Sequence, residues 1–187
     1  MTFNNHNNLA GQHSYMSASK YHWIKYDDAK MAETYRNFLA TLRGTELHEF
    51  AAQCIKLKQK LPRAQKTLNM YVNDAIGYRM TPEQVLHYSN NCFGTADAIC
   101  FDENKGFLRI HDLKTGVTKT HIEQLEIYAS LFCLEYGHKP GDLEMELRIY
   151  QNNEVLVHNP NASEILPIMD KIIRFDKLLD KVREEEA

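Results

Sequence analysis

The segments Gly94-Thr95-Ala96-Asp97-Ala98-Ile99 and Ile110-His111-Asp112-Leu113-Lys114-Thr115-Gly116 decide the expected fold of this chain. Both lie on short apolar runs of the kind that forms strands, and residues 102–106 between them are rich in turn formers. We therefore expect a hairpin in which Asp97 and Asp112 are neighbours in space. A helix is expected next, over residues 121–136, because apolar side chains recur there every three or four positions.

Apolar patterns on both sides of this centre predict the remaining elements. Helices are expected over residues 27–42, 46–59 and 64–78. Gly44 and Thr45 are expected to separate the first two helices, and Ser163 is expected to cap a long final helix. Strands are expected over residues 84–89, 93–101, 106–113, 143–151 and 155–158. This order predicts an α/β domain with a mixed central β-sheet flanked by helices.

Length and composition are typical of one folded domain. The 187 residues, 43% hydrophobic and 25% charged, are enough for a sizeable core, and we expect a single domain over residues 15–187. Residues 1–14 are polar and rich in asparagine, so they are expected to be disordered. The sequence shows neither an apolar run near the length of a membrane span nor a secretory signal pattern, so no membrane partner is expected.

Cysteine usage and charge narrow the possible function classes. The four cysteines form no Cys-x-x-Cys pair, which favours reduced thiols over a cysteine-ligated zinc site. Reduced thiols are typical of the cytoplasm, so a cytoplasmic location is expected, including the cytoplasm of an infected host cell. The formal net charge of −3 argues against a protein that coats nucleic acid non-specifically.

One local basic run is still compatible with a nucleic-acid partner. Its members are Lys56, Lys58, Lys60, Arg63 and Lys66, with no acid among them. If the helix before it continued, Lys56, Lys60 and Arg63 would share a face that could track phosphates. A solvated helix face without function is the alternative.

Asp97, Asp112 and Lys114 are the residues that indicate chemistry. Two neighbouring carboxylates repel each other unless a cation lies between them, and hard divalent ions such as Mg²⁺ or Mn²⁺ prefer oxygen ligands. Asp112 and Lys114 are two positions apart on one strand and therefore face the same side. A lysine beside a metal ion can orient water for attack on a phosphodiester, and the carbonyl oxygen of Leu113 can reach the same ion. An exposed strand pair without function is the alternative interpretation.

Four short motifs occur in an order that resembles a known family. They are Gly44-Thr45-Glu46-Leu47-His48, Gly94 to Asp97, Asp112-Leu113-Lys114-Thr115-Gly116, and Gln124 with Tyr128. Together they resemble the PD-(D/E)xK nuclease superfamily, in its RecB-like branch with phage exonuclease relatives. Ser17-Ala18-Ser19-Lys20 is similar to the opening of phage members, so the resemblance covers residues 15–158. Asp112 stands where many relatives carry glutamate, and both acids fit the family pattern.

The resemblance implies a role for each matched residue. A restriction-endonuclease-like core would carry a metal ion held by His48, Asp97, Asp112 and the Leu113 carbonyl. Lys114 would position the attacking water. Gln124 and Tyr128, which share a helix face at a spacing of four, would support the site or the scissile strand. For His48 a solvated helix histidine is the alternative, and for Tyr128 a half-buried core tyrosine.

The function implied by the resemblance is a Mg²⁺- or Mn²⁺-dependent deoxyribonuclease. An exonuclease of phage or bacterial recombination or repair is the first expectation, with DNA as partner and without an iron–sulphur cluster. A recombination partner, such as a single-strand annealing protein, and either a monomer or a homo-oligomer fit this interpretation. A structure-specific or single-strand endonuclease uses the same residues. A non-catalytic nucleic-acid-binding module on the nuclease fold is the alternative of a different class.

Overall fold

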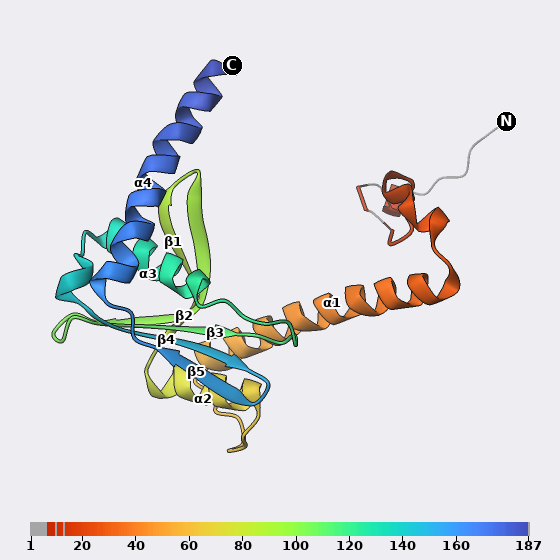
Figure 1. Cartoon of the computed structure of the whole chain (residues 1–187). Helices are drawn as coiled ribbons and strands as arrows, with labels where there is room; N and C mark the ends of the chain where they lie inside the picture. The colour runs from red at the N-terminus through yellow and green to blue at the C-terminus, as the bar shows by residue number, and fades with distance from the viewer. Residues whose placement is uncertain (1–6, 10, 13, 187) are drawn as a thin grey trace. The chain divides into compact units, whose positions relative to one another are not determined.

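The computed structural model describes residues 7–9, 11–12 and 14–186 (Figure 1). The predicted disorder of residues 1–14 concerns in part residues 1–6, 10 and 13, which lie outside the described residues. No helix of the described residues is long and apolar enough to cross a membrane.

The chain divides into two compact units, Met1–Arg43 and Gly44–Ala187. In the first unit, the ring of Tyr15 packs against Tyr35 and Phe38, with ring centroids 4.9 and 5.1 Å apart. The predicted site residues all belong to the second unit. A single domain over residues 15–187 stays a prediction.

Helix α1 runs from Asp28 to Lys56 without a break, so the predicted separation of two helices at Gly44 is wrong. A glycine inside a helix costs only about 1 kcal/mol relative to alanine, which the neighbouring turns can offset. The glycine at position 44 is needed for packing, because a Cβ there would lie 2.9 Å from Oγ1 of Thr115. The helix ends at Lys56 rather than residue 59, and Lys58 just beyond it has a left-handed φ of 55°.

The five strands form one mixed sheet in the order β1-β2-β3-β4-β5. Strands β3 and β4 are parallel, and the other neighbouring pairs are antiparallel. The strands are β1 (Thr81–Ser89), β2 (Cys92–Asp102), β3 (Phe107–Leu113), β4 (Glu144–Gln151) and β5 (Glu154–His158). The predicted α/β class with a mixed central sheet flanked by helices is therefore confirmed.

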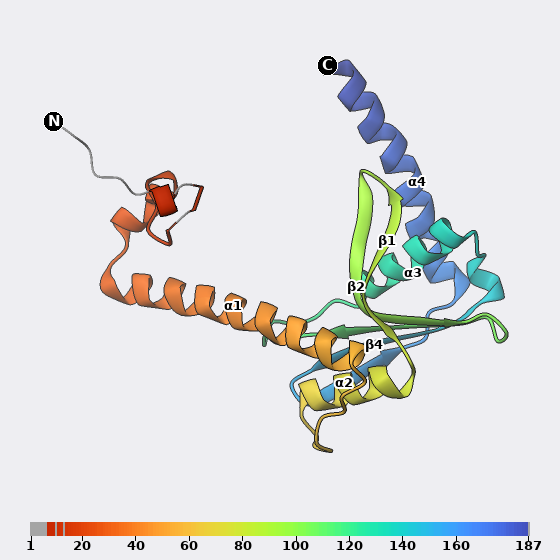
Figure 2. The same cartoon turned by 180° about the vertical axis from the view of Figure 1, so that it is seen from behind.

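Helices cover both faces of this sheet (Figures 1 and 2). On one face α3 (Glu123–Tyr136) and α4 (Ala162–Glu185) enclose a core that includes Leu108, Ile110 and Leu147. On the other, α2 (Thr67–Gly77) and the end of α1 enclose a second core around Tyr71 and Leu113. The sheet is thus the middle layer of the second unit, and its strands β2 and β3 lie between two packed cores.

The start of α4 differs from the prediction. Asn161, not Ser163, caps the helix, because its side chain accepts a hydrogen bond from the Ser163 amide at 2.9 Å. The Glu164 carboxylate accepts a hydrogen bond from the Asn161 amide at 2.9 Å, which completes a reciprocal capping box. The capping interaction fixes the direction of Glu164 in the first turn.

Candidate metal centre

The pairing of strands β2 and β3 brings the side chains of Asp97 and Asp112 close to each other. Ala98 pairs with His111 across the two strands, so each aspartate lies next to a paired position. The Asp97 carboxylate accepts a hydrogen bond from the backbone amide of Leu113 at 2.8 Å through Oδ2. The neighbourhood of Asp97 and Asp112 that the sequence predicts is therefore present. Leu113 meets Asp97 through its amide, and its carbonyl as a metal ligand stays a prediction.

Asp112 lies deep in the site, with a side chain only 3% exposed. Nζ of Lys114 lies 3.1 Å from its Oδ1 and donates a hydrogen bond to it. The same nitrogen lies 3.0 Å from Oδ2, yet Oδ2 is buried and accepts no hydrogen bond. A buried carboxylate oxygen without a hydrogen bond is costly, so this atom is suited to a further cation.

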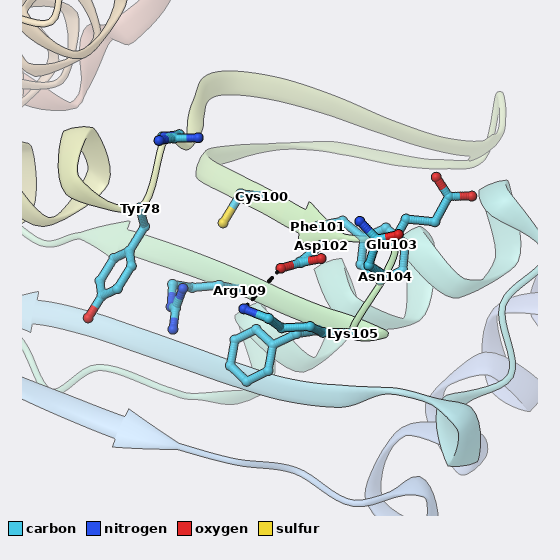
Figure 3. Close-up of a pocket in the computed structure, with 10 residues that line it drawn as sticks. Tyr78, Cys100, Phe101, Asp102, Glu103, Asn104, Lys105 and Arg109 are labelled. Carbon is cyan, nitrogen blue, oxygen red and sulfur yellow. Dashed lines mark ion pairs between the residues drawn. The ribbon is translucent and has the colours of Figure 1, made fainter.

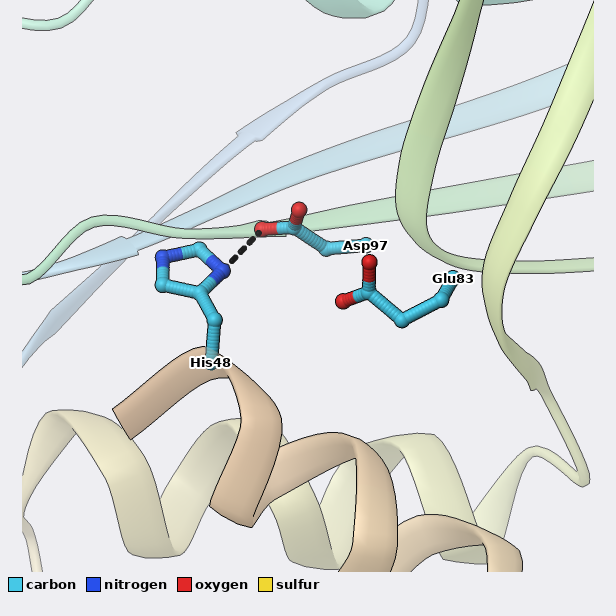
Figure 4. Close-up of side chains that lie close together, drawn as sticks. All are labelled: His48, Glu83 and Asp97. Carbon is cyan, nitrogen blue, oxygen red and sulfur yellow. Dashed lines mark ion pairs between the residues drawn. The ribbon is translucent and has the colours of Figure 1, made fainter. Parts of the chain in front are cut away.

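His48 and Glu83 complete the cluster around Asp97 (Figure 4). Nδ1 of His48, from the helix α1, lies 3.4 Å from Oδ2 of Asp97. Figure 4 shows Glu83 of β1 directed toward the same two side chains, and the ligand atoms of these three residues lie within 4.8 Å of one another. Such carboxylate and imidazole groups could bind a metal ion.

Glu83 is the site residue that the sequence prediction missed. The predicted strand began at residue 84, whereas β1 begins at Thr81. Glu83 lies between the cross-strand pairs Pro82 with Ala98 and Gln84 with Ala96, and is therefore opposite Asp97. Its φ of 53° is left-handed, which interrupts the regular alternation of the strand. The available signal was the acid itself, directly before a strand that pairs with the Gly94-to-Asp97 motif.

The carboxylates of Asp97, Asp112 and Glu83 place several negative charges near the end of β3. Burial raises the pKa of Asp112 most, and the negative charge of Asp97 raises it further, while Lys114 opposes both effects. The pKa of Glu83 is raised first by partial desolvation and then by Asp97. The pKa of His48 is raised chiefly by its hydrogen bond with Asp97, against the effect of burial. The negative charge of Asp97 thus disfavours ionisation of both Asp112 and Glu83, and a divalent cation bound among these carboxylates would offset this repulsion.

Gln124 and Tyr128 extend the site onto α3. Oε1 of Gln124 accepts a hydrogen bond from Nζ of Lys114 at 2.8 Å. Nε2 of Gln124 in turn lies 3.4 Å from the hydroxyl oxygen of Tyr128. A Cβ on Gly94 would lie 2.9 Å from Cε1 of Tyr128, so the small residue in the β2 motif allows this ring to approach the strand. The structure thus joins Gln124 to Lys114 and leaves Tyr128 at the margin of the cluster.

The condition for a shared basic face, a helix that continues beyond Lys56, is not met. Because α1 ends at Lys56, the helix does not continue far enough to align Lys56, Lys60 and Arg63 on one side. Lys56 lines a hollow together with His48 and Glu83. A second hollow, lined by Lys114, Gln124 and Lys119 among others, adjoins the cluster from the α3 side.

A separate hollow at the turn between β2 and β3 contains none of the predicted site residues (Figure 3). Two arginines, Arg79 and Arg109, line it, and the guanidinium group of Arg109 lies 3.7 Å from the ring centroid of Tyr78 and pairs with Glu146. Lys105, at the rim, pairs with Asp102 at 3.3 Å, as the dashed line in Figure 3 marks. Because Arg109 and Lys105 already have acidic partners and the hollow contains none of the predicted site residues, it is a weaker candidate for chemistry than the site around Asp97 and Asp112.

Comparison with known proteins does not assign this cluster. No family model matches the chain, and neither the curated proteins nor the solved structures give a significant match. The resemblance to the PD-(D/E)xK nucleases stays a prediction that rests on the motifs and on the geometry just described.

Proposed function

We propose that the protein is a metal-dependent phosphodiester hydrolase, and specifically a deoxyribonuclease of the PD-(D/E)xK type with a restriction-endonuclease-like core. The observation that carries the proposal is the meeting of Asp97, Asp112 and Lys114 at the end of β3. Each occupies the motif position that the resemblance implies, and Nζ of Lys114 lies 3.0 Å from the Asp112 carboxylate. His48, from a distant motif, lies 3.4 Å from Asp97.

The donor set fits Mg²⁺ or Mn²⁺. Asp97, Asp112 and Glu83 supply hard carboxylate oxygens, and His48 adds an imidazole nitrogen of the kind that Mn²⁺ accepts. The buried Oδ2 of Asp112 that accepts no hydrogen bond is available as one ligand. When bound, such an ion polarises a phosphoryl oxygen and lowers the pKa of bound water.

Lys114 and Gln124 have the geometry of a positioning pair. The ammonium group of Lys114 is held between Asp112 and Gln124, at 3.1 and 2.8 Å. A lysine ammonium has three N–H donors, so one donor is left to hold a water molecule or a phosphate oxygen. Charge that develops on the phosphoryl oxygens in the transition state is stabilised by this positive group.

The surroundings of the cluster favour an extended anionic substrate. The hollow beside His48 contains Lys56, and the hollow beside Gln124 contains Lys119. A nucleic-acid strand that passes through both would place one phosphate at the carboxylates and its neighbours near these lysines. We propose exonucleolytic cleavage of DNA, in recombination or repair, as the activity of this site.

A cleavage assay on two forms of one DNA tests the proposal. End-labelled linear duplex and covalently closed circles are incubated with the full chain and Mg²⁺, Mn²⁺ or EDTA. We expect short products from the linear form with either metal, intact circles and no cleavage with EDTA. Fragmented circles would favour the endonuclease alternative. A folded protein that binds DNA without cutting it under any condition would support the non-catalytic alternative and contradict the proposal.

A further inference from the structure

A second cluster of metal-ligating side chains lies away from the aspartates. It consists of Glu126 on α3, His158 at the end of β5 and Glu164 in the first turn of α4. One ligand atom from each of these residues lies within 4.8 Å of the others. Nε2 of His158 lies 3.3 Å from Oε1 of Glu126 and 3.2 Å from Oε1 of Glu164.

The imidazole nitrogen Nε2 of His158, at the centre of this cluster, is a buried polar atom without a hydrogen bond. Nε2 of His158 is inaccessible to solvent and makes no hydrogen bond, although two carboxylate oxygens lie so close to it. A nitrogen in this position is placed to share its lone pair with a cation between the three side chains. The two distances from Nε2 to the carboxylate oxygens, 3.3 and 3.2 Å, fit such an ion. A tetrahedral ion with bonds of about 2.0 to 2.1 Å holds its ligand atoms about 3.3 Å apart.

The negative charges of Glu126 and Glu164 are not balanced by a lysine or arginine among the described residues. Among the described residues, both pair with His158 and neither pairs with a lysine or arginine. Glu164 is fixed before any ion binds, because its Oε2 accepts a hydrogen bond from the Asn161 amide at 2.9 Å. This leaves Oε1 directed at His158. Glu126 is held with a side chain only 12% exposed.

This cluster is separate from the aspartate site. Glu126 is two positions from both Gln124 and Tyr128 on α3, and two positions correspond to about 200° around a helix. Glu126 and its contact with His158 therefore lie on the side of α3 opposite to Gln124, which holds Lys114.

We propose that Glu126, His158 and Glu164 form a site for a tetrahedral divalent cation of the zinc class. One imidazole and two carboxylates are a three-residue ligand set that suits zinc, and the fourth position is left to water. The ion would connect α3, the end of β5 and the start of α4, and would thereby stabilise the helical layer on this face of the sheet.

Zinc titration on a background without the aspartate site tests the proposal. In the Asp97→Asn/Asp112→Asn double variant, calorimetry should find one Zn²⁺ bound per chain and a rise in melting temperature with Zn²⁺. Adding His158→Gln should weaken zinc affinity about 100-fold or more and remove the rise. The matched control is His121→Gln, which changes an exposed histidine 3.7 Å from Glu123 and should leave both readouts unchanged.

Two results would overturn this assignment. One is the absence of zinc binding to the folded background variant, which would leave the cluster as a contact between a histidine and two glutamates. The other is equal zinc affinity in the His158→Gln and His121→Gln proteins. If His158→Gln does not fold, Glu126→Gln replaces it, because this change keeps the side-chain shape and removes one ligand charge.

Discussion

The ammonium nitrogen of Lys114 lies 2.8 Å from Oε1 of Gln124, so a single hydrogen bond joins the end of β3 to the first turn of α3. Asp112 holds the same nitrogen from the strand side at 3.1 Å. The position of the ammonium group is therefore fixed by two elements rather than by the rotamer of one long side chain. A charged group held in place before the reaction is what transition-state stabilisation requires.

Replacing Lys114 tests this role directly. Lys114→Met keeps the apolar stem and removes the ammonium, so the rate of DNA cleavage should fall about 100- to 1000-fold. Mn²⁺ affinity, measured by calorimetry, should stay within a few-fold of wild type. Lys105→Met is the control, because Lys105 pairs with Asp102 at the exposed β2–β3 turn and lines none of the hollows beside the predicted site. An unchanged turnover number with a raised Michaelis constant would instead make Lys114 a substrate-binding residue.

Asp112→Asn separates catalysis from stability. Loss of this carboxylate should reduce cleavage by about 1000-fold or more, since metal-assisted charge stabilisation contributes several kcal/mol. The metal-free protein should become more stable at neutral pH. Burial and Asp97 raise the pKa of Asp112, so its ionised form opposes folding. Urea unfolding in EDTA measures the free energy of unfolding of the two proteins. Asp102→Asn is the control, because the side chain of Asp102 is much more exposed than that of Asp112. A clear loss of stability in Asp112→Asn would contradict the raised pKa of Asp112 as the cause.

The raised pKa of His48 predicts how metal affinity depends on pH. The proton on the imidazole competes with the metal, and the hydrogen bond with Asp97 extends this competition to higher pH. Mn²⁺ affinity should therefore rise between about pH 6 and 8, by up to about tenfold per pH unit from this group. The His48→Asn variant should bind Mn²⁺ more weakly and with a shallower pH dependence. Equal slopes for the two proteins would return His48 to an ordinary helix histidine.

Gly94 should tolerate no side chain. In Gly94→Ala the new Cβ would lie 2.9 Å from Cε1 of Tyr128, whose ring packs against the core on the α3 side. The ring must move, so stability should fall by about 1 to 3 kcal/mol, with a parallel loss of cleavage activity. Gly77→Ala is the matched control, because a Cβ added at Gly77 would meet open space within 4 Å. Equal unfolding midpoints for the two variants would refute the close approach.

The buried ring of His111 should make the free energy of unfolding depend on pH in the acid range. Its ring is fully buried beside Tyr78 and Tyr150, and neither ring nitrogen has a hydrogen bond. Burial, and then the charges of Arg148 and Arg109, lower the pKa of His111 to about 2. Below about pH 6.5 the unfolded chain takes up a proton that the folded chain refuses, so stability falls by up to about 1.4 kcal/mol per pH unit.

The His111→Leu variant removes this proton and should flatten the pH dependence of unfolding between about pH 6.5 and 5. It should also gain about 1 kcal/mol at neutral pH, because two unsatisfied nitrogens disappear. Exposed His121→Leu serves as the control. If His111→Leu and wild type lose stability equally in acid, the buried neutral imidazole is not responsible.

The central part of the fold could be predicted because local pattern and tertiary structure agree there. The apolar runs before Asp97 and Asp112 form β2 and β3, and the turn between them is as short as expected. The helix predicted over 121–136 appears as α3, and Gly137, with a φ of 71°, ends it. The spacing of Gln124 and Tyr128 then places both on the side that faces the site.

The parts that could not be predicted depend on contacts between distant segments. Gly44 locally indicates a helix end, but a glycine is needed there because Thr115, from a distant part of the chain, lies close to it. Glu83 follows Pro82, which argues against a strand interior, and its left-handed φ hides it from any alternation pattern. Its place opposite Asp97 follows from the register of β1 on β2, which no local signal specifies.

A crystal structure of the Lys114→Met protein with a short DNA duplex and Mn²⁺ tests the central claim most directly. Anomalous scattering would locate the metal while the variant leaves the DNA uncut. We expect an ordered Mn²⁺ within about 2.0 to 2.6 Å of carboxylate oxygens of both Asp97 and Asp112, with a phosphate oxygen on its open side. Mn²⁺ ordered elsewhere, or DNA bound with its phosphates away from these two aspartates, would contradict the account.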